Sequence, residues 1–179
     1  VVPLIGGLTF VGLFLTHGAF FIALKTDGPI RADARALGIK TGLVTAVLAV
    51  VLLLAINVRH GSLVSWIGTV VAAVALLGGI FMATKGREGW AFLGTFVCIA
   101  FAVVAYFGAL FPNAMPTTLA DGADLTLAAA SSTPKTLTIM TWAAAVFTPI
   151  VLLYQGWTYW VFRKRISTKN IPAPVTVGK

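Results

Sequence analysis

Charged residues are scarce in this sequence, and five long stretches contain none at all. The 179 residues include 13 Lys and Arg and 5 Asp and Glu. None of these lies within residues 4–24, 41–58, 62–83, 90–111 or 137–162. A helix needs about 20 apolar residues to cross a hydrocarbon core about 30 Å thick. Because the stretches lack the two-residue alternation of barrel strands, we expect an all-α, polytopic transmembrane bundle with five spanning helices.

Side chains that could carry out chemistry are equally few. Cys98 is the only cysteine, which excludes an internal disulfide and a cysteine-based metal site, and we interpret it as a small buried hydrophobe. The sequence contains no Ser-His-Asp set, H-E-x-x-H motif or metal-spaced cluster. The five stretches also lack the charged groups that proton pumps and ion-coupled transporters usually place at membrane depth. We therefore expect a membrane-embedded bundle with no catalytic apparatus and no metal-binding cluster of its own.

The basic residues are distributed unevenly between the connections. The net charge is +8, and 59% of the residues are hydrophobic. With five helices in order, the connections 25–40 and 85–89 and the tail from Arg163 lie on one side of the membrane. These segments hold every Lys and Arg except Arg59 and Lys135. Cytoplasmic loops are enriched in Lys and Arg, so we expect this side to be cytoplasmic. The basic bias indicates topology rather than a nucleic-acid partner.

The connections divide the chain into four expected regions. Residues 1–24 form a first helix, and residues 25–40 form a cytoplasmic connection. That connection begins with a turn at Asp27-Gly28-Pro29 and continues as a short helix to about Lys40. Residues 41–162 form a four-helix transmembrane bundle, and residues 163–179 form a basic cytoplasmic tail. An odd number of helices with an outward amino terminus predicts that further helices precede Val1.

Two polar side chains at membrane depth and one aromatic residue are the candidates for binding. His17 is either a haem ligand or proton relay, or a neutral imidazole that hydrogen-bonds a neighbouring helix. Gln155, in the last helix, either binds a quinone carbonyl or joins two helices. Trp142 belongs to a set of Trp residues near the predicted membrane boundaries, where amphipathic rings favour the headgroup level. It is a further candidate for contact with lipid or quinone.

Small residues and one proline predict packing features. Ala75, Gly79 and Ala83 recur every four residues and would form a ridge for close helix packing. Pro149 interrupts the last helix and should kink it. These residues indicate packing rather than ligand binding. From the residues alone, two classes remain open: a structural subunit of a larger membrane enzyme, or part of a membrane transporter or channel.

Several motifs resemble subunit II of cytochrome bd quinol oxidase. They occur in the order and spacing of that family and cover nearly the whole chain. The motifs are residues 16–31 (THGAFFIALKTDGPIR), 89–92 (GWAF), 108–118 (GALFPNAMPTT), 125–127 (LTL), 130–134 (ASSTP), 137–142 (LTIMTW), 149–160 (PIVLLYQGWTYW) and 163–166 (RKRI). Each motif alone is modest, whereas the ordered set is specific.

The resemblance implies a subunit of eight helices in two four-helix bundles. This chain matches its fourth to eighth helices, with residues 1–24 as the last helix of the first bundle. The family's oxidase lies in the bacterial plasma membrane, oxidises menaquinol or ubiquinol, and reduces dioxygen to water with protons from the cytoplasm. Haem b and haem d are implied to belong to the partner, subunit I. Small accessory subunits, lipids and quinone are further implied partners.

The resemblance assigns no catalytic residue to this chain. The acidic and aromatic residues that the family uses for proton entry lie in the half of the subunit that this sequence does not include. His17 falls where the family needs no haem ligand. The resemblance therefore implies a scaffold role for these five helices.

Overall fold

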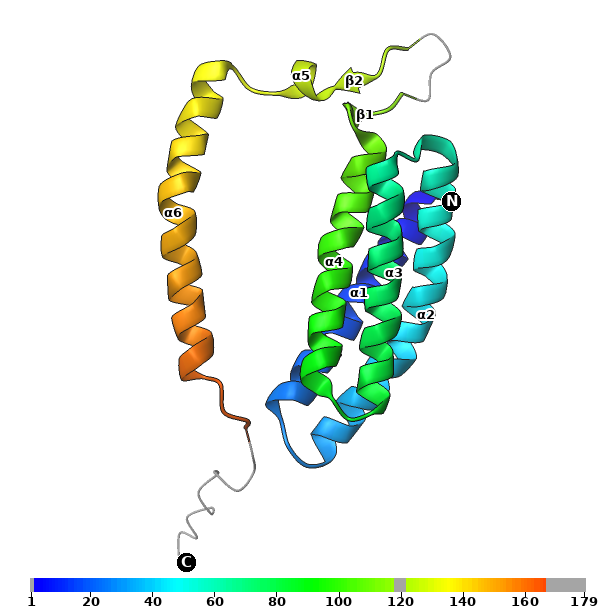
Figure 1. Cartoon of the computed structure of the whole chain (residues 1–179), viewed down its shortest axis with the longest axis vertical. Coiled ribbons are helices and arrows are strands. Elements are labelled where there is room, and N and C mark those ends of the chain that lie inside the picture. The colour runs from blue at the N-terminus through cyan, green and yellow to red at the C-terminus, as the bar shows by residue number, and fades with distance from the viewer. Residues whose placement is uncertain (1, 118–121, 167–179) are drawn as a thin grey trace, which may run out of the picture. The chain divides into compact units, whose positions relative to one another are not determined.

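The computed structural model describes residues 2–117 and 122–166, and most of them are helical (Figure 1). Five helices are long and apolar enough to cross a membrane. This confirms the all-α, polytopic architecture predicted from the sequence. In chain order the elements are α1 (Val2–Lys25), α2 (Pro29–His60), α3 (Leu63–Thr84), α4 (Glu88–Leu110), β1 (Asn113–Met115), β2 (Leu125–Thr126), α5 (Leu127–Ala130) and α6 (Pro134–Val161).

These elements fall into two compact units. The first unit contains α1–α4 together with residues 165 and 166, and the second contains β1, β2, α5 and α6. The predicted grouping of residues 41–162 into one bundle stays a prediction, because α2–α4 and α6 belong to different units.

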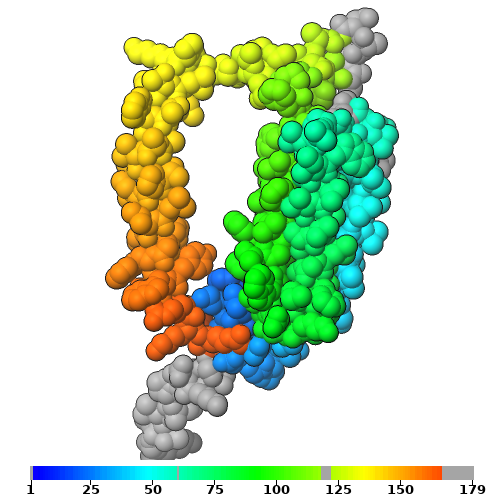
Figure 2. Space-filling view, in the orientation of Figure 1, coloured from blue at the N-terminus to red at the C-terminus, as the bar shows by residue number. Residues whose placement is uncertain are grey.

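The first unit buries small and aliphatic side chains along its axis. One core cluster joins α1, α3 and α4 through Leu13, Leu76 and Cys98. A second cluster joins Phe20 with Ala83 and Ala91. The buried position of Cys98 confirms its interpretation as a core hydrophobe. Large apolar side chains also cover the outside of the unit. Helices α3 and α4 form much of the face of this unit that Figure 2 shows. Such an apolar exterior is what a bilayer solvates.

Helix α2 corrects one expectation from the sequence. The sequence predicts a separate short helix from Pro29 to about Lys40, but these residues are the first turns of one 32-residue helix. At 1.5 Å per residue α2 is about 48 Å long, which exceeds a hydrocarbon core of about 30 Å. A glycine allows the charged first turns of α2 to pack closely against α1. A Cβ at Gly38 would lie 2.5 Å from a ring atom of Phe20, so only glycine fits there without movement.

The second unit begins with a short antiparallel pair of strands. Asn113 pairs with Thr126, and Met115 pairs with Leu125. The carboxylate of Asp124 accepts hydrogen bonds from the Asn113 amide at 2.6 Å and from the Thr117 backbone N–H at 2.8 Å. The predicted long outer connection therefore contains ordered structure.

Helix α6 starts at Pro134 and ends at Val161. The Thr133 hydroxyl caps it by accepting from the backbone N–H of Thr136. Proline at the first helical position suits a helix start, because its missing N–H would have no partner there. The helix continues through Pro149 as one element.

Candidate functional site

A buried carboxylate at the start of α4 gathers guanidinium groups from two other segments. The Glu88 side chain is 3% exposed, and Arg31 binds both of its oxygens, at 3.0 Å from Nε and 2.9 Å from Nη2. Nη2 of Arg35 lies 3.1 Å from the same carboxylate, and Nη2 of Arg165 lies 3.8 Å from it. Arg165 also pairs with Asp27 at 3.2 Å. We call these five residues the Glu88 cluster.

Local backbone geometry positions the first part of this cluster. Arg31 and Arg35 are four residues apart in α2, so their side chains emerge from the same face of the helix. In the turn between α3 and α4, Gly86 has a φ of 73°, a left-handed conformation that glycine adopts without strain. This tight turn places Glu88 in the first turn of α4, opposite the two arginines.

A short backbone pairing positions the other two members of the Glu88 cluster, Asp27 and Arg165. The backbone N–H of Ile166 donates to the carbonyl of Lys25 at 2.7 Å, and Thr26 and Ile166 form an isolated parallel bridge. Arg165 is thereby held beside the connection between α1 and α2, within reach of Asp27. Three segments that are distant in the sequence are thus joined around one carboxylate.

The Glu88 cluster was not predicted from the sequence, which suggested only a turn at residues 85–89. Two signals were present. Glu88 is an acid two residues before a charge-free stretch, and Arg31 and Arg35 are spaced to share one acceptor. A buried carboxylate is costly unless it is paired and hydrogen-bonded, and here Arg31 alone satisfies both of its oxygens. The arrangement is that of a structural ion-pair centre.

His17 contacts the helix beside its own. Its Nδ1 lies 2.8 Å from the hydroxyl of Thr95, and its ring stacks on Phe92 with 4.3 Å between ring centroids. The Thr95 hydroxyl has one hydrogen, which it donates to the Phe92 carbonyl at 2.9 Å. If that hydrogen stays on the carbonyl, Nδ1 of His17 is the donor to Thr95 and Nε2 is the acceptor. The packing interpretation expects such an interhelical bond, although Nε2 is also the atom that a metal ligand would use.

The other two candidate residues lie on α6 in the second unit. Trp142 is 71% exposed, and Gln155 is also exposed. They are 13 positions apart in the helix, which is about 20 Å along its axis. They therefore do not form one site with each other.

Glycine contacts bring α3 and α4 unusually close. A Cβ on Gly79 would lie 3.1 Å from the Ala91 carbonyl oxygen, and one on Gly94 would lie 2.7 Å from the Gly79 Cα. Both neighbours are backbone atoms, so neither helix can yield by turning a side chain. Ala83, on the same predicted ridge, is fully buried, and Ala75 contributes the carbonyl that faces Gly94. Gly94, the α4 side of this contact, was missed from the sequence.

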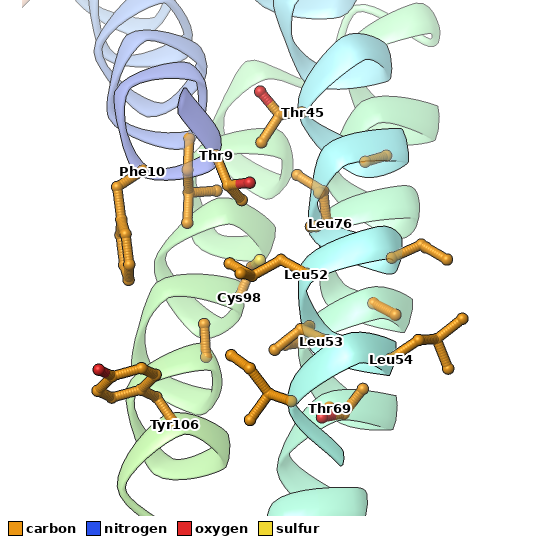
Figure 3. Close-up of a pocket in the computed structure, with 18 of the residues that line it drawn as sticks. Thr9, Phe10, Thr45, Leu52, Leu53, Leu54, Thr69, Leu76, Cys98 and Tyr106 are labelled. Carbon is orange, nitrogen blue, oxygen red and sulfur yellow. The ribbon is translucent and has the colours of Figure 1, made fainter. Parts of the chain in front are cut away.

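An apolar cavity of about 160 Å³ lies among α1–α4. Figure 3 shows Leu52, Leu76 and Cys98 around it, with Phe10 and Tyr106 at one side. An enclosed protein cavity of about 150 Å³ with an aliphatic lining stays dry and binds benzene or xenon, whereas some residues that line this one, such as Leu54 and Tyr106, are themselves exposed. This cavity therefore suits a small apolar guest or a piece of hydrocarbon chain. None of His17, Trp142 or Gln155 lines it.

The described residues offer no preformed metal site, because no three His, Cys, Asp or Glu side chains gather within residues 2–117 and 122–166. Haem iron takes an axial ligand such as His, Cys or Met. Cys98 is enclosed in the core of the first unit, and His17 bonds Thr95 through Nδ1.

Comparison with known proteins gives one consistent family. Residues 1–162 match the family model described as cytochrome bd terminal oxidase subunit II. The chain is 36% identical over 176 residues to the cytochrome bd ubiquinol oxidase subunit 2 of Bacillus subtilis, an alignment that covers 95% of this chain and 52% of the relative. It is 29% identical over 202 residues to the cytochrome bd-I ubiquinol oxidase subunit 2 of Escherichia coli, covering 94% and 53%. The chain thus spans about half the length of these relatives.

Proposed function

The chain belongs to the cytochrome bd terminal oxidase subunit II family, and on that basis we propose that it is part of the non-haem scaffold subunit of a quinol oxidase. The complex would oxidise menaquinol or ubiquinol in the membrane and reduce dioxygen to water. Water formation would consume cytoplasmic protons and so contribute to the proton gradient. The observation that carries this proposal is the family match over residues 1–162.

The character of the spanning helices supports a scaffold role. The five predicted charge-free stretches contain no carboxylate, lysine or arginine for a proton pathway, and the buried acid among the described residues of the first unit, Glu88, is bound by arginines at the end of its helix. The comparisons name oxidase subunits and do not support the alternative of a transporter or channel. We propose that the close contact between α3 and α4 keeps the first unit rigid enough to support a partner.

We propose that haem b and haem d are held by the partner, subunit I, and that His17 is a helix contact. The bond from Nδ1 to Thr95 and the stacking on Phe92 support this assignment. Haem in the complex would supply the electron transfer and the dioxygen chemistry. The residues of this chain would shape the apolar surroundings. Small accessory subunits are a further proposed partner class.

We propose that residues 25–40, the turn 85–89 and the chain from Arg163 face the cytoplasm. The uneven distribution of Lys and Arg supports this orientation. The membrane would be the bacterial plasma membrane, as expected for a respiratory oxidase.

Gln155 and Trp142 are proposed contacts with quinone, lipid or a neighbouring subunit. An amide that faces hydrocarbon without a hydrogen-bond partner is costly, so the exposed Gln155 side chain should find an acceptor or donor outside its own helix. Trp142 is placed to contact headgroups through its ring.

Copurification tests the proposed function. An affinity tag on this chain should recover a haem-bearing partner from native membranes, as a red-brown complex with the long-wavelength band of haem d. The purified complex should consume oxygen when it is given a quinol. A colourless preparation with transport activity would refute the assignment.

A further inference from the structure

One end of the first unit carries more cations than its carboxylates can neutralise. This basic end comprises residues 25–40, 85–88 and 165. Its three carboxylates are Asp27, Asp33 and Glu88. Its seven cations are Lys25, Arg31, Arg35, Lys40, Lys85, Arg87 and Arg165. The carboxylates of Glu88 and Asp27 are already paired with arginines of the Glu88 cluster. A net positive field therefore remains at this end, and it attracts an anion.

Arg35 is the member of the cluster with an unmet hydrogen bond. Its Nη2 reaches Glu88 at 3.1 Å, but its Nε is buried and has no partner among the described residues. Its Nη1 lies next to the tight turn at Gly86, where an added Cβ would come within 3.3 Å. The side chain as a whole is 30% exposed, so an incoming group can reach the guanidinium, although Nε itself is covered. A guanidinium is a rigid fork of donors that matches phosphate or carboxylate oxygens.

Exposed apolar side chains lie close in sequence to the residues of this end. Ile22 is 47% exposed on α1, Leu37 is 47% exposed on α2, and Trp90 is 61% exposed on α4. Lys85 also lies over the ring of Phe81, at 5.3 Å from its centroid, so that cation and apolar surface meet at one level. A ligand that satisfies both features has an anionic head and hydrocarbon chains.

We propose that the basic end binds the phosphate of an anionic phospholipid, with Arg35 as the main donor and the exposed apolar side chains against its acyl chains. Basic pockets between spanning helices bind anionic headgroups, and each Lys or Arg near such a surface contributes to the attraction. The lipid fits better than an acidic polypeptide, because a polypeptide segment has no hydrocarbon chains to cover Ile22, Leu37 and Trp90. The site goes beyond the proposed oxidase role and does not depend on it.

Lipid titration of the purified complex tests the site. The complex is delipidated in mild detergent, titrated with phosphatidylglycerol or phosphatidylcholine, and the bound lipid is counted by native mass spectrometry. Phosphatidylglycerol should bind more tightly than phosphatidylcholine. Arg35→Gln should weaken phosphatidylglycerol binding about fivefold, which corresponds to about 1 kcal/mol. Arg59→Gln, which removes the same charge at the opposite end, should leave binding unchanged.

Two further measurements, one on Arg35→Lys and one on competition by inorganic phosphate, distinguish the possible causes of weaker binding. Arg35→Lys retains the charge but loses Nε, and it should bind with intermediate affinity. It also replaces Arg35→Gln if that variant does not fold, as judged by circular dichroism. Inorganic phosphate at the same concentration should compete weakly. Equal binding of the two lipids, equal effects of Arg35→Gln and Arg59→Gln, or full competition by inorganic phosphate would each overturn the proposal.

Discussion

Removing Arg31 should destabilise the first unit more than removing Arg35, although both arginines contact the same carboxylate. Arg31 makes two charge-assisted bonds to Glu88, at 3.0 and 2.9 Å, whereas Arg35 is placed for one, at 3.1 Å. In Arg31→Gln, a carboxylate that is 3% exposed keeps only a partial set of partners. Lys40, an exposed residue farther along the same helix, provides the matched control.

The expected magnitudes follow from burial. Breaking a fully buried ion pair costs about 3–5 kcal/mol because the remaining charge is uncompensated. Arg31 is 32% exposed, so solvent screens part of the interaction, and Arg35 still compensates Glu88 in the variant. We therefore expect about 2 kcal/mol for Arg31→Gln and about 1 kcal/mol for Arg35→Gln. Lys40→Gln should stay within about 0.5 kcal/mol of the parent.

Double-mutant cycles measure the pairings directly. The single variants Arg31→Gln, Arg35→Gln and Glu88→Gln are combined pairwise, and the full chain in mild detergent is unfolded with sodium dodecyl sulfate while circular dichroism is followed. The coupling energy of Glu88 with Arg31 should exceed that with Arg35 by about 1 kcal/mol. A coupling with Arg31 that is equal to or smaller than the coupling with Arg35 would refute the bidentate geometry as the stabilising contact.

Three other predictions concern packing, haem and topology. Gly94→Ala should cost about 1–3 kcal/mol and lower the recovery of assembled complex, because its Cβ would lie 2.7 Å from a backbone atom of α3; Gly78→Ala, with nothing within 4 Å, is the control and should behave as the parent. His17→Ala should keep every haem band and lose about 0.6 kcal/mol, the average for one intramembrane hydrogen bond, whereas loss of a Soret component in the absorption spectrum would make His17 a ligand. In a cysteine-free background, Ala32→Cys and Ala123→Cys should react with an impermeant thiol reagent from opposite sides of sealed vesicles, and reaction of both from one side would contradict the five-helix topology.

The number and position of the spanning helices were readable from the sequence because each depends on local composition. A charge-free run of about 20 residues must be helical in hydrocarbon, whatever its neighbours are. The structure confirms this for all five runs. The continuity of the helix from residues 29–40 into residues 41–60 could not be predicted from local composition. Polarity changes there, but no proline separates the two parts, so composition suggested a boundary that the backbone does not have.

The sites depended on tertiary structure because their members come together only after folding. The sequence by itself determined five apolar helices, a basic side and the small-residue ridge at Gly79. Only the tertiary structure decided that Glu88 is shared by Arg31 and Arg35, that His17 bonds Thr95, and which residues line the cavity. Helix formation in a membrane is fixed by the chain's own hydrogen bonds. Pairing between helices depends instead on which faces meet and on how closely the backbones approach, and a single sequence does not state that.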